Sequence, residues 1–382
     1  MNFGRPLKFL IPFAIMLVAL VVWAQPADQA PSQNSQPTGA HTPPAHPGSR
    51  RVTTQAATPA GKAEPGEGVV RATLKNGLRV VIVPDNLAPV ATTVVNYLVG
   101  SNEAPAGFPG MAHAEEHMMF RGSADLSADQ LSKISAAMGG NFDADTQQTV
   151  TQYFFTVPAE DTDVALHIES LRMRGVLNSD QLWDKERGAI EQEVSQDLSN
   201  PTYVFYTKLL TAMFNGTPYE HDALGTRPSF EKTTGTDLQE FRNKWYAPNN
   251  AVMVIAGDVD PQKTLTEVKT LFDDIPSKQV PARPQVKLNP VASQTLNLDT
   301  DLPYGLAVIS YRAPGTDSAD FAAMDILSDV ISSQRGSLYA LVPEGKALGT
   351  EFEYSPLPKS GLVYALAAYP QGGNGQALVD EI

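Results

Sequence analysis

A sharp change in composition near residue 66 decides how much of this 382-residue chain can fold. The segment over 25–66 is rich in Pro, Ala, Ser, Thr and Gln and has almost no large apolar side chains. Burial therefore cannot offset the entropy lost on ordering it. We expect a disordered linker over 25–66, with His41 and His46 exposed to solvent. The core must come from the chain after about residue 67.

The first 24 residues have the pattern of a targeting segment. Arg5 and Lys8 precede an apolar run over 9–23, and the sequence at 22–24 resembles a small-residue cleavage site. The run is shorter than the ~20 residues that cross a bilayer. We interpret 1–24 as a signal peptide, or as a membrane anchor if it is not cleaved. In both cases the rest of the chain is exported, to a periplasm or to the medium.

The chain after residue 67 alternates strand and helix patterns, which predicts an α+β fold with helices on one face of each sheet. Asn76-Gly77 between two β-rich runs predicts a hairpin. Ser127 and Gln130 form a capping box, which predicts the start of a helix that Gly139-Gly140 ends. Further strands are expected at 90–99, 149–157 and 251–256, and helices at 111–120, 160–174, 180–199, 202–214 and 237–245, with a last one around 265–272.

Four prolines spread over 276–290 indicate a second linker. A new block of strands and one striped helix follows it, with strands at 306–312, 350–354 and 362–368 and the helix over 321–331. We therefore expect a first domain over 67–274, a linker over 275–290 and a second domain over 291–382. The second block is much shorter than the first, so we expect it to be truncated and the chain to be a fragment of a longer protein.

Charge and cysteine content narrow the classes of function. The net charge of −14 argues against a nucleic-acid partner, because phosphates need a basic surface. The chain has no cysteine, which excludes disulfides, cysteine catalysis and thiolate metal sites. A metal site in this chain must therefore use histidine and carboxylate ligands.

One such site is indicated by His113-Ala114-Glu115-Glu116-His117. Residues four apart on a helix lie on the same face, so His113 and His117 can bind one ion. Glu116 projects toward the same side, where it can hold the attacking water. The order is the reverse of the commoner His-Glu-x-x-His helix. The flanking methionines and Phe120 are interpreted as core.

A catalytic zinc needs a third protein ligand beside an open position for water. The expected helix over 180–199 offers Glu186 and Glu193, which are seven residues apart and on one face. Glu191 and Asp197 point elsewhere on that helix. On the pattern alone the choice stays open, because acidic residues on a helix usually form a solvated face.

At this point the chain resembles the pitrilysin/insulinase family, the inverzincins, which includes the mitochondrial processing peptidases. That family follows His-x-x-Glu-His with a stretch like Glu-Arg-Gly-x-x-x-x-Glu, which matches Glu186 to Glu193 here. The resemblance implies that His113, His117 and Glu193 bind one zinc ion in the catalytic domain. It implies that Glu186 supports a ligand from behind, and that the two domains are related to each other.

The resemblance also covers the first hairpin and the stretches 245–250, 256–259 and 332–348. The family usually has Gly-Gly-x-x-Asn-Ala before a long strand, and this chain has Asp143 in place of that Asn, followed by Ala144. By resemblance, Asp143 and Ala144 hold the substrate backbone. Substrate is expected to add as a strand at a sheet edge, for which we predict the run Thr149–Val157.

The resemblance implies a zinc-dependent endopeptidase that hydrolyses peptides or unfolded polypeptides, with Glu116 as the base. The alternative is a non-cutting peptide-binding subunit of a two-chain peptidase. In active members a second homologous half supplies an Arg and a Tyr, so we expect such a half from a longer chain, a homodimer or a heterodimer. His167 is interpreted as structural or exposed, and His221 as solvated.

Overall fold

The computed structural model describes residues 68–382, so the predicted signal peptide and first linker lie outside the described residues. The fold is α+β. A six-stranded sheet has the order β1-β2-β6-β3-β5-β4 and is antiparallel apart from the β2–β6 pair. Its strands are β1 (Val70–Thr73), β2 (Arg79–Pro84), β3 (Val90–Tyr97), β4 (Asn141–Thr146), β5 (Thr151–Pro158) and β6 (Ala251–Gly257).

The predicted Asn-Gly hairpin is confirmed by the antiparallel pairing of β1 and β2. Gly77 takes a φ of 90°, which a residue without Cβ adopts at no steric cost. Asn76 has a second role, because its buried amide donates hydrogen bonds to the carbonyls of Phe272 and Ile275 at 2.7 and 2.9 Å. The turn therefore also fastens the end of a helix to the sheet.

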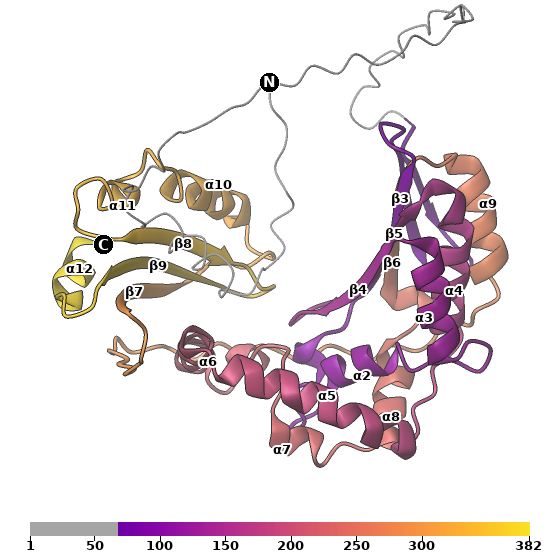
Figure 1. Cartoon of the computed structure of the whole chain (residues 1–382), viewed down its shortest axis with the longest axis horizontal. Coiled ribbons are helices and arrows are strands. Elements are labelled where there is room, and N and C mark those ends of the chain that lie inside the picture. Colours follow the sequence, from indigo (N-terminus) through magenta and orange to yellow (C-terminus); the bar gives the residue numbers. More distant parts are fainter. Residues whose placement is uncertain (1–67) are drawn as a thin grey trace, which may run out of the picture. The chain divides into compact units, whose positions relative to one another are not determined.

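Three helices lie along one face of this sheet (Figure 1). The capping box of Ser127 and Gln130 is present at the start of the first of them, and Gly139 ends it at a φ of 67°. Apolar residues alternate along the strands and pack against these helices in two clusters. The larger includes Val95, Met253 and Phe272, and the smaller joins Leu131 of the first helix to Phe155. The helices are α3 (Ala128–Met138), α4 (Thr162–Arg174) and α9 (Pro261–Phe272).

A second group of helices lies at one end of the sheet (Figure 1). The predicted break between the helices at 180–199 and 202–214 is confirmed. One helix ends at Leu198, and the next begins at Pro201 with the Asn200 side chain as its cap, because a residue before proline is pushed out of the helical conformation. These helices are α2 (Met111–Met118), α5 (Asp180–Leu198), α6 (Pro201–Phe214), α7 (Arg227–Phe230) and α8 (Gly235–Trp245). Short 3-10 turns lie at Ser101–Glu103, Ala159–Asp161, Pro218–Glu220 and Pro248–Asn250.

The prediction that Thr149–Val157 forms the sheet edge was wrong. That run forms β5, which pairs with β3 on one side and β4 on the other. The edge next to it is β4, whose sequence Asn-Phe-Asp-Ala-Asp-Thr contains residue types that are depleted in strands. The low β propensity of β4 is the reason that the sequence did not predict it. The neighbouring strand β5 has the stronger β pattern but lies inside the sheet.

The second sheet has three antiparallel strands in the order β7-β9-β8. Its elements are β7 (Tyr304–Ala313), α10 (Phe321–Ile331), α11 (Ser337–Ala340), β8 (Gly349–Ser355), β9 (Gly361–Pro370) and α12 (Gly375–Glu381). The predicted stripe forms α10, but none of its residues is fully buried. The stretch 276–303 has no helix or strand. The domain boundaries expected from the sequence stay a prediction.

Among the described residues, every helix is too short or too polar to cross a membrane.

Candidate metal centre

Helix α2 carries the His-x-x-Glu-His residues, and two glycines bring a distant loop against its start. Gly110 precedes the helix at a φ of 87° and faces Gly225, which has a φ of 85°. A Cβ on either glycine would lie 2.6 Å from the Cα of the other. Because both side chains are absent, the loop that contains Leu224 can approach the helix closely.

Both imidazoles are fixed by hydrogen bonds at Nδ1. His113 Nδ1 lies 3.0 Å from the carbonyl oxygen of Leu224, and His117 Nδ1 lies 2.8 Å from Glu186 Oε1. Since a carbonyl and a carboxylate only accept, each Nδ1 is the donor, and the lone pair of the neutral imidazole therefore lies on Nε2. This arrangement is typical of metal-binding histidines, whose second nitrogen is held by a carbonyl or a carboxylate.

Glu193 spans the two free nitrogens. Its Oε1 lies 3.5 Å from His113 Nε2, and its Oε2 lies 3.4 Å from His117 Nε2. Tetrahedral zinc with ligand bonds of about 2.0–2.2 Å holds its ligand atoms about 3.4 Å apart, so these residues fit the ion. The Glu193 side chain is 45% exposed, whereas His113 is 9% exposed. The centre is therefore open on the Glu193 side, as a fourth position for water requires.

Glu116 is the other carboxylate at this centre. Its ligand atom and those of His113 and His117 all lie within 4.8 Å of one another, so proximity alone also allows Glu116 as a ligand. Its orientation favours a different role, because its Oε2 accepts a 2.6 Å hydrogen bond from the Thr146 hydroxyl at the end of β4. Glu193, in contrast, faces both imidazole Nε2 atoms. Burial raises the pKa of Glu116, against the opposing effects of His113 and Thr146.

Glu186 holds His117 from behind. Its side chain is almost fully buried, and its second oxygen pairs with the Arg121 guanidinium. Burial raises the pKa of Glu186, but the hydrogen bonds from His117 and Arg121 outweigh it, and the net shift is downward. Glu186 is thus a charged acceptor for the Nδ1 proton of His117. Although burial lowers the pKa of His117, Glu186 and Glu193 raise it to about 9.

The other residues that were predicted from the sequence take no part in these hydrogen bonds. Asp143 and Ala144 lie on β4, where the Asp143 carboxylate accepts from the Ala144 amide at 2.9 Å. His167 is exposed on α4. His221 is half-buried, and its Nδ1 lies 3.0 Å from the carbonyl oxygen of Asp222, in the loop that leads to Leu224.

Sequence reasoning missed three contributors to the centre, namely Arg121, Thr146 and Leu224. Arg121 lies just after α2 and pairs with Glu186, which is 65 residues further along the chain. Thr146 ends a strand that the sequence did not predict. Leu224 acts through its carbonyl, which no side-chain pattern reveals.

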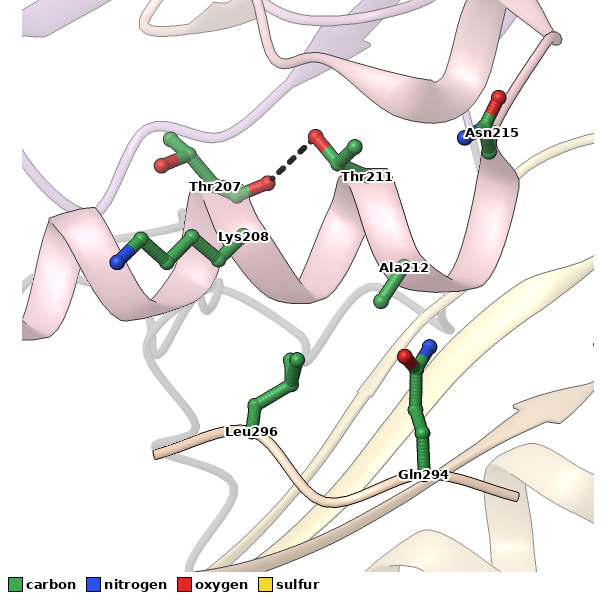
Figure 2. A pocket seen from close by; sticks show the side chains of 7 residues that line it. All are labelled: Thr207, Lys208, Thr211, Ala212, Asn215, Gln294 and Leu296. Atoms are coloured by element: carbon green, nitrogen blue, oxygen red, sulfur yellow. Dashed lines mark hydrogen bonds between the residues drawn. The ribbon is translucent and has the colours of Figure 1, made fainter. Parts of the chain in front are cut away.

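A pocket of about 460 Å³ lies elsewhere, between α6 and the segment before β7 (Figure 2). It has one charged lining side chain, Lys208, and shares no residue with the centre described above. Its lining residues are Thr207, Lys208, Thr211, Ala212, Asn215, Gln294 and Leu296.

Two family sequence models match the chain. Residues 79–227 match the insulinase family, peptidase family M16, and residues 232–379 match the M16 inactive domain. Together they cover most of the chain. The chain belongs to peptidase family M16. Its first matched region holds the His-x-x-Glu-His helix and Glu193, whereas its second matched region corresponds to a domain described as inactive.

Several curated relatives of this M16 chain are named zinc proteases. It is 27% identical over 271 residues to the zinc protease PqqE of Helicobacter pylori, covering 69% of this chain and 61% of the relative. It is 30% identical over 222 residues to an uncharacterized zinc protease of Streptomyces coelicolor, covering 58% of this chain and 48% of the relative. The crystal structure of a Helicobacter pylori protease matches with a TM-score of 0.75 and 25% identity, over 82% of this chain and 78% of that one. This M16 chain thus spans about half to three fifths of these curated relatives.

Proposed function

We propose that the protein is a zinc-dependent endopeptidase, with His113, His117 and Glu193 as the metal ligands. The observation that carries the proposal is the position of Glu193, whose two oxygens face the two free imidazole nitrogens at 3.5 and 3.4 Å. The described groups suit one zinc ion in the first domain. The family membership and the zinc protease relatives support the same metal.

Zinc, when bound, lowers the pKa of a coordinated water and polarises the peptide carbonyl. The protein's own groups do the rest. Glu116 accepts the proton of the attacking water and then donates it to the leaving amine. The Thr146 hydroxyl holds one Glu116 oxygen at 2.6 Å and so directs the other toward the substrate. Glu186 and the Leu224 carbonyl keep both imidazoles in the tautomer that exposes Nε2.

Substrate is proposed to add as an extended strand along β4. This strand is one of the two edges of the sheet, and it ends at Thr146, which contacts the proposed base. An edge strand offers unpaired backbone groups that bind an extended peptide without regard to most of its sequence. Asp143 and Ala144, which the family resemblance offers as contacts for the substrate backbone, lie on this edge strand.

The second candidate function is a peptide-binding subunit that does not cut. One observation favours it: residues 232–379 match the M16 inactive domain. The intact set of His113, Glu116, His117 and Glu193 favours the enzyme, because a binding subunit has no need of a base beside a metal. A second homologous half, from a longer chain or another subunit, is proposed to complete the active assembly. The apolar run near the N-terminus supports export to a periplasm or to the medium.

Glu116→Gln separates the two functions. Glutamine has nearly the same shape but cannot take up a proton, so the variant should retain zinc and lose at least 10²–10⁴-fold in peptide cleavage. The assay uses unfolded peptides with the complete assembly, and elemental analysis gives the zinc content. Equal cleavage by wild type and Glu116→Gln would contradict the role of Glu116, and no cleavage by either, with peptide binding retained, would favour the subunit.

A further inference from the structure

Glu115 is the second acidic residue of the metal-binding helix, and its surroundings differ from those of Glu116. It follows His113 by two residues, which places it about 200° around the helix axis, on the side opposite the metal face. It is 0% exposed. Glu115 therefore points into the core and cannot reach a substrate or the attacking water.

Two side chains from outside the helix meet the Glu115 carboxylate. Asn178 donates a 2.7 Å hydrogen bond to Oε2, and Arg242 Nε lies 3.4 Å from Oε1. Arg242 is on α8 and only 2% exposed. Its guanidinium also donates to the backbone carbonyls of Arg172 and Met173 in the last turn of α4. The buried carboxylate thus joins α2 to two other segments, and Arg242 extends the link to α4.

The contact with Asn178 bears most directly on the metal centre. Asn178 lies two residues before α5, and α5 carries both Glu186 and Glu193. A tetrahedral site needs its ligands on α2 and α5 in a fixed register, because shifts of a few tenths of an ångström change the metal distances. The Glu115 carboxylate lies where α2 meets the segment that leads into α5.

We propose that Glu115 is a positioning residue, which holds α2 and α5 in the register that the metal ligands require. This inference rests on the proposed zinc site. It assigns the two acidic residues of the motif to separate tasks: Glu116 faces the chemistry, and Glu115 fixes the helix from behind. Arg242 and Asn178 are its partners in this role.

The chain offers a matched control in Glu169, which is also 0% exposed and is paired with Arg172 at 3.1 Å. Both of those residues lie on α4, three residues apart, so their ion pair lies within one helix, which carries none of the proposed metal ligands. Loss of either buried carboxylate leaves an arginine without its partner, which destabilises the fold. Only Glu115 should also affect the metal.

The test compares Glu115→Gln with Glu169→Gln in the full chain. Zinc affinity is measured by chelator competition below both melting temperatures, and Tm is measured on the metal-free proteins. We expect Glu115→Gln to weaken zinc binding about 10- to 100-fold and Glu169→Gln to change it less than about 3-fold. The loss of Tm should be similar in the two variants. Equal weakening by the two variants would overturn the inference and leave the zinc site intact.

A double variant, Glu115→Leu with Arg242→Met, covers the case in which Glu115→Gln does not fold. An apolar pair removes the unpaired charge, so Tm should recover. Zinc affinity should stay reduced, because the link to Asn178 is still absent. If the double variant recovered zinc affinity fully together with Tm, Glu115 would have only a role in stability. A wild-type chain that binds no zinc would instead overturn the proposed function, and the inference with it.

Discussion

The two sheet regions of this chain share an architecture and differ in chemistry. The first, over 70–272, has six strands and carries on α2 a group of side chains that could hold a metal ion. The second, over 304–381, has three strands, and the sequence contains no histidine after His221. Strands backed by helices thus occur both with and without such side chains, so the scaffold alone does not determine function.

The regions also differ in how firmly their helices are held. Helix α5 buries Trp183, Glu186, Ile190 and Val194, at helical spacing along one face, whereas α10 in the second region has no fully buried residue. A helix that presents metal ligands has to be fixed by its packing, since the ligands tolerate little movement. The more firmly packed helix is the one that carries Glu193.

The largest expected effect comes from removing an imidazole in the first region. His113→Ala should abolish stoichiometric zinc binding and peptide cleavage, because two remaining ligands hold the ion weakly. His167→Ala is the control, since that imidazole is exposed on α4. Elemental analysis of the purified proteins measures the difference. Stoichiometric zinc in His113→Ala would place the metal somewhere else and break the contrast between the regions.

A graded effect is expected from the two glutamates of α5. Glu193→Gln replaces a charged ligand and should reduce zinc affinity severely, well beyond 100-fold. Glu186→Gln can still accept the Nδ1 proton of His117, so it should cost about 10- to 100-fold in affinity or activity. Chelator competition ranks the two variants. The reverse order would mean that their roles are exchanged.

A substitution in the second region should have the smallest effect on zinc affinity. Leu362 is 2% exposed and packs against residues of α6, including Leu210 and Phe214. Leu362→Ala should lower the free energy of unfolding by about 2–5 kcal/mol through the cavity it leaves. Its zinc affinity, measured at a temperature where the protein is folded, should equal that of wild type. A marked loss would show that the two regions are coupled in metal binding.

The elements with strong local signals were predictable from the sequence. The hairpin at Asn76-Gly77, the cap at Ser127 and the break at Asn200-Pro201 each depend on a few neighbouring residues, and the structure contains all three. The pair of histidines also followed from local spacing. Glu193 came from the family resemblance, because on pattern alone it was one of several acidic residues on a helix.

The rest depends on contacts between distant residues. The polar strand β4 owes its place to its pairing with β5, so propensity did not reveal it. Arg242 lies 127 residues along the chain from its partner Glu115, and Leu224 lies 111 residues from its partner His113. No local pattern encodes such contacts, and one of them is made by a backbone carbonyl.

The central claim is that one zinc ion lies among His113, His117 and Glu193. The most direct test is X-ray diffraction from crystals of the zinc-loaded protein, recorded on both sides of the zinc absorption edge. The account predicts one anomalous peak in the first region, about 2.0–2.1 Å from both imidazole Nε2 atoms and about 2.0–2.2 Å from a Glu193 oxygen. A peak bound by other residues, or no peak among these three in zinc-loaded protein, would contradict it.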